Sequence, residues 1–173
     1  MKKKNSMLVL AILVAVLVLG VGYAAVSAVN LTIEGSAKSK DSNLNVVFTG
    51  EVTTSTAGAS AGAAISASSE NDGLTATINV TGLQAVNDTV SATYTIKNKE
   101  NDLSASIVEA ANGITNSKSE FFSVSTDMTT AKTVAKGATT TVTVTVKLIK
   151  VPISDADSTS NISVKLEATP VNP

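Results

Sequence analysis

The stretch that decides the fold is TTTVTVTVKLIKV, residues 139–151. Aliphatic residues alternate with threonines along it, and a period of two is typical of a β-strand with one buried face and one exposed face. The aliphatic positions are Val142, Val144, Val146 and Leu148. This stretch therefore predicts a long strand with an apolar inner face and a threonine-rich outer face, as antiparallel sheets with one solvated side require.

The same alternation recurs along the chain. Residues rich in Gly, Asn, Asp and Ser separate the alternating stretches, and such residues favour turns. Eight short strands with turns between them predict an all-β fold, a two-sheet antiparallel sandwich of the jelly-roll or immunoglobulin-like kind. The eight stretches are 29–35, 44–50, 73–82, 90–98, 102–109, 121–126, 139–151 and 161–170.

Two segments depart from this rhythm. Residues 53–73 are rich in Ala, Ser and Gly, and we expect a flexible surface excursion there, with a short helix or a weak strand inside it. Residues 108–111 are compatible with a brief helical turn before Asn112-Gly113. Neither segment indicates a second domain, so residues 29–173 are expected to form one β-sandwich domain.

The composition excludes several classes of function. The chain has no Cys and no His, which removes disulfides, thiolate metal sites and the commonest general base. It also has no Trp and few other aromatic residues, and beyond Lys2, Lys3 and Lys4 its ten lysines face 14 acidic residues, a net charge of −4. A mildly acidic chain with few aromatic residues has no footprint for nucleic acid. We expect no cofactor and no enzymatic activity.

The N-terminus has the order of a secretory signal. A basic start, MKKKNS, precedes an uncharged apolar run of 13 residues, MLVLAILVAVLVL, and small residues follow. Cleavage is expected after Ala28, or alternatively after Ala24, so residues 1–28 form the predicted signal peptide. The alternative is an uncleaved anchor, because the 23 residues of 7–29 carry no charge and a helix of that length spans a bilayer. The expected partners are signal peptidase and the export machinery, with the membrane contacted only through this segment.

The candidate ligand and catalytic groups have simpler structural interpretations. Asp155, Asp157 and Asn161 have the alternate spacing of calcium ligands, but Ser160 and Leu166 stand where an EF-hand loop needs Gly and Glu. A polar turn explains these residues. Nor does the sequence place a carboxylate pair in a cleft or contain a Gly-x-Ser-x-Gly motif. We therefore assign no catalytic, cofactor-binding or metal-binding residue.

The stretch VNLTIEG, residues 29–35, lies directly behind the expected cleavage site. Val29, Leu31 and Ile33 alternate with polar residues, so this stretch predicts a strand that cleavage would free. A free strand can add to the sheet of another subunit, with alternate side chains filling pockets. These three residues form the candidate donor strand. The alternative is that the strand pairs within its own domain.

Three stretches together resemble the TasA/camelysin family of secreted Gram-positive matrix proteins. They are GVGYAAVSA (20–28), SATYTIKNKENDLSASI (91–107) and VAKGATTTVTVTVKL (134–148). The resemblance covers roughly residues 1–50 and 74–169, in the order of signal, strands and turns. It implies a jelly-roll-like sandwich that is exported and assembles into extracellular fibres of a biofilm matrix. A metal-dependent protease activity described for camelysin does not transfer, because this chain has no His.

The expected function is accordingly that of a secreted structural subunit, located in the extracellular matrix or at the cell surface, that self-associates into filaments by exchange of its N-terminal strand. The alternative is an adhesin or another ligand-binding β-sandwich module, either membrane-tethered or secreted. Sugar-binding sandwiches usually present exposed aromatic side chains for stacking, and few aromatic residues are available here.

Overall fold

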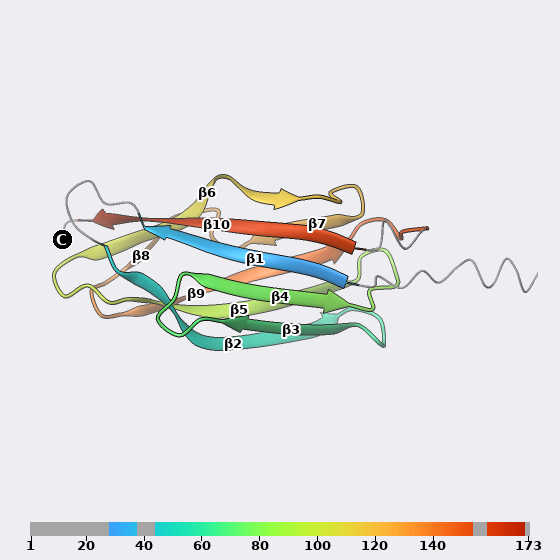
Figure 1. Cartoon of the computed structure of the whole chain (residues 1–173), viewed down its shortest axis with the longest axis horizontal. Coiled ribbons are helices and arrows are strands. Elements are labelled where there is room, and N and C mark those ends of the chain that lie inside the picture. The colour runs from blue at the N-terminus through green and yellow to red at the C-terminus, as the bar shows by residue number, and fades with distance from the viewer. Residues whose placement is uncertain (1–27, 38–43, 154–158, 172–173) are drawn as a thin grey trace, which may run out of the picture.

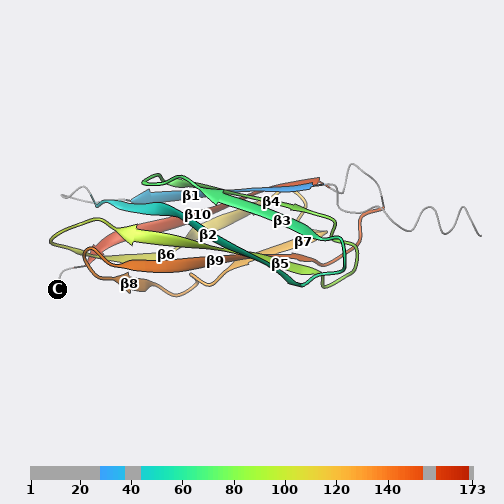
Figure 2. The same ribbon diagram turned by 90° about the horizontal axis from the view of Figure 1, so that it is seen from below.

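The computed structural model of the chain describes residues 28–37, 44–153 and 159–171. These residues form ten strands in two layers, which confirms the predicted all-β sandwich (Figures 1 and 2). The predicted N-terminal signal helix lies outside the described residues. The strands are β1 (Ala28–Ala37), β2 (Val46–Gly58), β3 (Ala64–Ser69), β4 (Thr75–Thr81), β5 (Thr89–Asn98), β6 (Ser104–Asn116), β7 (Phe122–Thr126), β8 (Lys132–Val134), β9 (Thr139–Leu148) and β10 (Thr159–Val171).

One sheet, here named sheet A, has the strand order β3-β4-β1-β10-β6-β8, and the other, sheet B, has the order β2-β5-β9-β7. Sheet B is antiparallel throughout, as predicted. Sheet A is mixed, because β1 runs parallel to β10 and antiparallel to β4. The expectation of antiparallel pairing throughout is therefore wrong at this one position. The eight strands between β1 and β10 form a long connection, so no tight hairpin forces these two strands to run antiparallel.

The core lies between the two sheets and follows the predicted alternation. The four aliphatic residues Val142, Val144, Val146 and Leu148 are on β9 and are buried, whereas Ile149 follows the end of the strand and is 40% exposed. The apolar residues that alternate along the predicted stretches 73–82, 90–98 and 161–168 should face inward, and they are buried as well, with one exception. Leu74 is 45% exposed, because it lies in the turn before β4 and not on the strand itself.

Tyr94 connects the two sheets across this core. Its ring is fully buried on β5 and meets Phe48 edge to face, with 6.0 Å between the ring centroids. Its hydroxyl donates a hydrogen bond of 2.8 Å to the carbonyl oxygen of Thr77 on β4 of sheet A. Burial raises the pKa of Tyr94, so the phenol stays protonated and remains a donor.

The two segments without clear alternation are both built from strands. Residues 53–58 belong to β2 and residues 64–69 form β3, where the structure shows alternating half-buried and exposed side chains. The helical turn expected at 108–111 is wrong, because this part of the chain continues β6. Residues 110–113 form a bulge there, opposite Lys165 of β10.

The bulge explains why the sequence contains Asn112-Gly113 at this point. Asn112 has a φ of 55°, a left-handed conformation that Asn tolerates better than most residues. A Cβ atom on Gly113 would lie 2.7 Å from the carbonyl oxygens of Ala110 and of Lys165, so only glycine fits. The Asn-Gly pair thus marks a bulge within a strand and not the end of a helix.

Candidate assembly site

The candidate donor strand is β1, and it occupies a central position in sheet A. Ten consecutive residues of β1 pair with β10, and six pair with β4 on the other side. Both edges of its backbone are therefore engaged in the sheet ladder. Without β1, sheet A would separate into a β3-β4 pair and a β10-β6-β8 group, each with one newly open edge. The position that β1 fills between β4 and β10 is here named the β1 slot.

On the core side of the slot, Ile33 is fully buried, as the alternation predicts. Its register partners are Ala76 of β4 and Val164 of β10, which are also buried. The backbone of Val29 and Leu31 occupies the two preceding alternate positions of the same ladder. Their partners include Val80, Ile78 and Ile162, all of which are buried. The slot is thus lined with aliphatic residues on both sides of Leu31 and Ile33, whereas Val29 has Val80 on one side and the buried hydroxyl residue Ser160 on the other.

On the outer face, a row of hydroxyl side chains crosses five strands at the register position of Thr32. Successive members of the row are register partners of one another, and they are Ser68, Thr77, Thr32, Ser163 and Thr115. The Ser68 and Thr77 hydroxyls lie 2.9 Å apart and those of Thr115 and Ser163 lie 2.7 Å apart, so each pair is hydrogen-bonded. Thr32 holds the middle place between these two bonded pairs.

A second polar row lies at the register position of Asn30, two residues earlier. Asn30 is paired with Asn79 of β4 and with Asn161 of β10, and Asn79 is paired with Ser66 of β3. Opposite side chains in neighbouring strands interact, so the hydroxyl row at Thr32 favours one register over its neighbours. A shift of β1 by one residue would exchange its two faces, and a shift by two would place an acidic residue, Glu34, in the hydroxyl row.

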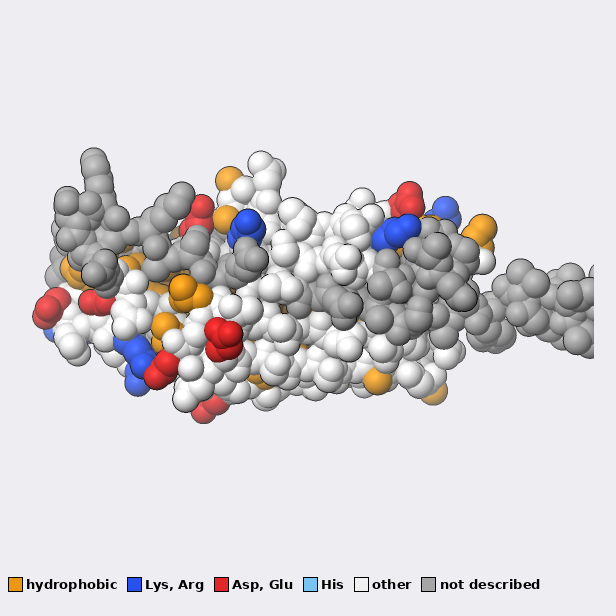
Figure 3. All heavy atoms as spheres, in the orientation of Figure 1, with side chains coloured by type: hydrophobic (Ala, Val, Ile, Leu, Met, Phe, Trp, Pro, Cys, Tyr) orange, Lys and Arg blue, Asp and Glu red, His pale blue; other side chains and the backbone are white. Residues whose placement is uncertain are grey.

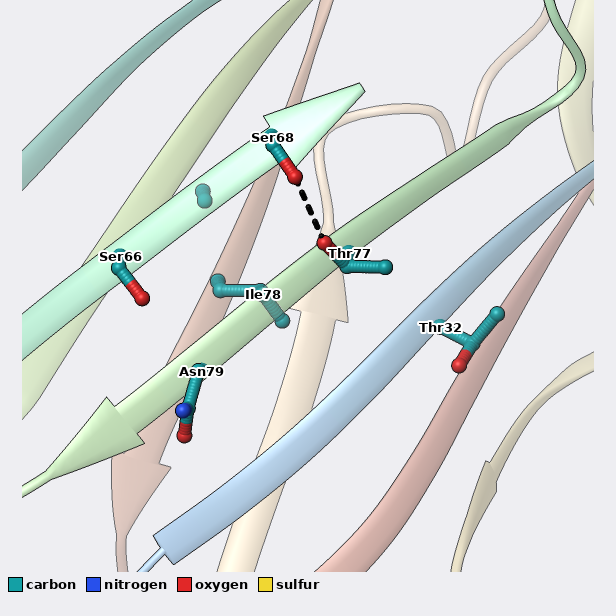
Figure 4. Close-up of a pocket in the computed structure, with 7 residues that line it drawn as sticks. Thr32, Ser66, Ser68, Thr77, Ile78 and Asn79 are labelled. Carbon is teal, nitrogen blue, oxygen red and sulfur yellow. Dashed lines mark hydrogen bonds between the residues drawn. The ribbon is translucent and has the colours of Figure 1, made fainter. Parts of the chain in front are cut away.

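A shallow groove of about 360 Å³ runs over this outer face, along β3, β4 and β1 (Figure 4). Its lining includes Thr32, Ser66, Thr77 and Asn79, so it presents hydroxyl and amide groups and carries no charged side chain. Aromatic residues do not contribute to it. Thr32 comes from β1, so the groove has its full lining only when the slot is occupied.

The described structure places the other candidates apart from this site. Ala28 is the first residue of β1 and pairs with Thr159, whereas Ala24 lies outside the described residues. Asp155 and Asp157 also lie outside them, and Asn161 is an exposed residue of β10. Within the described ranges, no group of three or more acidic residues is placed to hold a metal ion. No helix in the described part of the chain is long and apolar enough to cross a membrane.

The carboxylate of Glu100, in a charged turn between strands, has a structural role. It accepts a hydrogen bond of 2.7 Å from the backbone N–H of Asn45. The backbone N–H of Glu100 donates to the side-chain oxygen of Asn98. Asn98 is fully buried, and its amide donates to the carbonyl oxygens of Leu103 and Val134. These bonds close one end of the sandwich. They explain the charged and amide residues of this turn by a structural role, without a catalytic one.

Sequence reasoning missed the polar partners of β1 on β4 and β10. Thr77, Asn79 and Ser163 do alternate with aliphatic residues in TATINV and NISVKL, so their outward position can be read from the sequence. Their juxtaposition with β1 cannot, because it depends on strands that are distant in the chain. No protein-family model matches this chain, and no curated protein matches it in sequence.

Proposed function

We propose that this protein is a secreted structural subunit that assembles into extracellular matrix fibres by passing β1 from one copy to the slot of the next. The observation that carries the proposal is the place of β1. The first strand after the expected signal peptide fills a central position of a sheet, between β4 and β10. The resemblance to the TasA/camelysin family in the signal, strand order and turns supports the same function.

Exchange of β1 changes the chain that supplies the strand without changing the pairing. A donated strand that begins at Val29 makes nine of the ten register pairs with β10 and all six with β4. The free-energy difference between the closed monomer and the exchanged form then arises from the connection and from protein concentration. A strand attached to its own domain has a higher effective concentration at the slot than a strand from another copy. Raising the protein concentration reduces this advantage, so exchange is favoured in concentrated protein.

The connection between β1 and β2 limits how exchanged copies can be arranged. It consists of the eight residues 38–45, and a fully extended chain of this length joins Ala37 to Val46 over at most about 30 Å. The end of β1 and the beginning of β2 lie at the same end of the sandwich (Figure 1). In an exchanged pair, these ends of two neighbouring copies must therefore lie within that distance. A contact of this kind, repeated from copy to copy, is heterologous and produces filaments.

A cysteine cross-link across the slot tests the proposal. The chain has no Cys, so Thr32→Cys combined with Thr77→Cys introduces a single possible disulfide between register partners on β1 and β4. In a closed monomer this disulfide lies within one chain. In filaments it should join chains, and a ladder of multimers should appear on a non-reducing denaturing gel.

The matched control is Thr93→Cys with Thr143→Cys, which are register partners on β5 and β9 of sheet B. Both strands come from the same chain in either arrangement, so this pair should cross-link only within a chain in monomers and in filaments. Filaments whose Thr32–Thr77 disulfide also stays within single chains would rule out the exchange of β1.

The groove in Figure 4 favours a second candidate function, a ligand-binding module. Its hydroxyl and amide lining suits an uncharged polar ligand such as a carbohydrate. A glycan array probed with the monomer tests this function, with Asn79→Ala as the variant that removes an amide from the groove. Specific binding that is lost in this variant would support the second function, and an array without signal would oppose it.

A further inference from the structure

Three exposed aliphatic side chains gather at one end of the sandwich. Val86 is 51% exposed, Ile149 is 40% exposed and Ile153 is 84% exposed. They are three of the four large hydrophobic side chains that the described structure leaves exposed, the other being Leu74. We name these three residues the apolar tip. Such side chains in neighbouring loops form a contact surface, whereas scattered single ones do not.

The two loops that carry the apolar tip are fixed to each other and to the body of the domain. The N–H of Asn87 donates a hydrogen bond of 2.8 Å to the carbonyl oxygen of Leu148. The N–H of Leu148 donates one of 2.9 Å to the carbonyl oxygen of Asp88. The N–H of Ile149 donates to the carbonyl oxygen of Phe121. Val86 and Ile149 therefore protrude from a hydrogen-bonded base and have defined positions.

The apolar tip lies at the end of the sandwich where β1 begins. Ala28 pairs with Thr159, the first residue of β10, and Val29 pairs with Val80 near the end of β4. The loop that holds Val86 leaves this end of β4, and the connection that holds Ile149 and Ile153 leads to this start of β10. At the same end, Figure 3 shows hydrophobic side chains beside basic and acidic ones. Leu74 precedes the first residue of β4 and lies at the opposite end.

Charged residues of both signs lie near the apolar tip. Lys150 lies over the ring of Phe121, with its Nζ 5.2 Å from the centroid, and Lys118 is in the preceding turn. Glu120 is exposed in that same turn. A surface with apolar side chains and mixed charges suits the interface of a zwitterionic bilayer, where aliphatic groups enter the acyl boundary and Lys side chains remain at the headgroups.

The sequence that precedes Ala28 identifies the occupant. Residues 7–27 are 21 consecutive residues without a charge, which is enough for a membrane-spanning helix, and they join the domain at the same end as the apolar tip. We infer that the apolar tip rests on the surface of a phospholipid bilayer as long as residues 7–27 remain attached and inserted. The attachment makes this contact intramolecular, so the effective concentration is high and three aliphatic side chains suffice.

This contact would orient the domain with β1 starting at the membrane and the opposite end, with Leu74, pointing away. It also holds the peptide bond after Ala28, the expected cleavage site, close to the bilayer surface. The inference concerns the uncleaved chain and does not depend on whether cleaved copies form fibres.

Site-specific labelling of the full-length chain tests the inference. Because the chain has no Cys, Ile153→Cys places one environment-sensitive fluorophore on the apolar tip, and Leu74→Cys places the same fluorophore at the opposite end. The full-length protein is reconstituted into phosphatidylcholine vesicles that contain nitroxide-labelled lipid. We expect several-fold stronger quenching and a blue-shifted emission at position 153, with little change at position 74.

A second variant separates membrane contact from contact between protein copies. Val86→Ser with Ile149→Ser, in the Ile153→Cys background, should reduce the quenching, and circular dichroism checks that these exposed changes leave the fold intact. Equal quenching at positions 153 and 74 would overturn the inference. So would a blue shift at position 153 that grows with the protein-to-lipid ratio and is insensitive to nitroxide lipid, since that result identifies a second copy as the occupant.

Discussion

The two sheets of the sandwich are assembled from different parts of the chain. All four strands of sheet B come from residues 46–148, and β5 and β9 share nine register pairs without interruption. Sheet A takes its two central strands from opposite ends of the described chain. Sheet B is therefore complete within one continuous segment, whereas sheet A is complete only when β1 has entered.

Because of this difference, the two sheets are expected to have different roles, with sheet B contributing stability and sheet A offering a site for assembly. A sheet whose strands all come from one internal segment has no terminal strand that another copy can supply in exchange. A sheet whose central strand lies at the chain terminus has such a point, because that strand can be supplied by another copy with the same ladder. The predictions below test whether the two sheets differ in this way.

Deletion of residues 28–37 should have the largest effect. It opens the edges of β4 and β10 and uncovers the core beside them, so we expect loss of the cooperative unfolding transition. A synthetic peptide of sequence AVNLTIEGSA should restore the transition, as measured by circular dichroism during heating. The same peptide with Asp in place of Ile33 serves as the control and should not restore it. A truncated chain that unfolds as cooperatively as the full domain would show that sheet A does not need β1.

The substitution Ile33→Ala should be next in size. Ile33 is fully buried, so the cavity and the lost apolar contact should lower the free energy of unfolding by about 2–5 kcal/mol. Ile96→Ala on β5, where Ile96 is 4% exposed, is the matched change in sheet B. Denaturant unfolding should give similar losses for both. A loss well below that of Ile96→Ala would mean that β1 is less firmly held than the strands of sheet B.

The substitution Asp88→Asn should have an intermediate effect. The buried carboxylate of Asp88 accepts bonds from the N–H and hydroxyl of Ser60 and from the N–H groups of Gln84 and Ala85, at 2.7–3.0 Å. An amide cannot accept all four bonds, so we expect a loss of about 1–3 kcal/mol at neutral pH. Exposed Asp102, changed to Asn, is the control and should have little effect.

The cost of Asp88→Asn should also depend on pH. Burial alone would raise the pKa of Asp88, but the bonds from Ala85, Gln84 and Ser60 outweigh it and hold the pKa below its usual value of 3.8. The stabilisation by the charged carboxylate is therefore present above about pH 4 and is lost as the pH falls through the lowered pKa. The difference in unfolding free energy between the parent and the variant should shrink in acid. A difference that stays constant down to pH 2 would contradict this assignment.

The smallest effect is expected from Thr143→Val on the outer face of sheet B. The Thr143 hydroxyl lies 3.0 Å from that of Thr93, but this pair is only partly buried. We expect the unfolding free energy to change by no more than about 0.5 kcal/mol in denaturant unfolding. Thr77→Val in the hydroxyl row of sheet A is the corresponding change, and a clearly larger loss there would show that the row contributes to holding β1.

Local alternation predicts most of the fold because one face of each sheet is buried. Where valines alternate with threonines, as in β9, the contrast between the faces is strong. It is weak in β3, where AISASS is made mostly of small residues that alternate little in polarity, and β8 is only three residues long. These two strands were the ones missing from the eight predicted. The bulge in β6 was likewise not predicted from the sequence, because Asn-Gly more often marks a turn.

The site was predictable only in part. The inward direction of Ile33 follows from alternation alone, and the structure confirms it. The slot itself does not follow, because the parallel pairing of β1 with β10 joins segments at opposite ends of the chain. Asp88 was missed for a related reason, since its partner Ser60 belongs to a different turn. Local patterns indicate which way a side chain points, and long-range pairing decides what it meets.

The parallel pairing of β1 with β10 also sets the order of events during folding. During synthesis from the N-terminus, β1 appears early, but the strand beside it appears only when residues 159–171 have been made. Contacts between such distant segments form slowly, because closing a long loop costs entropy before any contact forms. Throughout this interval sheet B can form while sheet A remains open. If β1 is exchanged as proposed, the time for which sheet A stays open, and not only the final stability, governs how often a strand from a neighbouring chain arrives first.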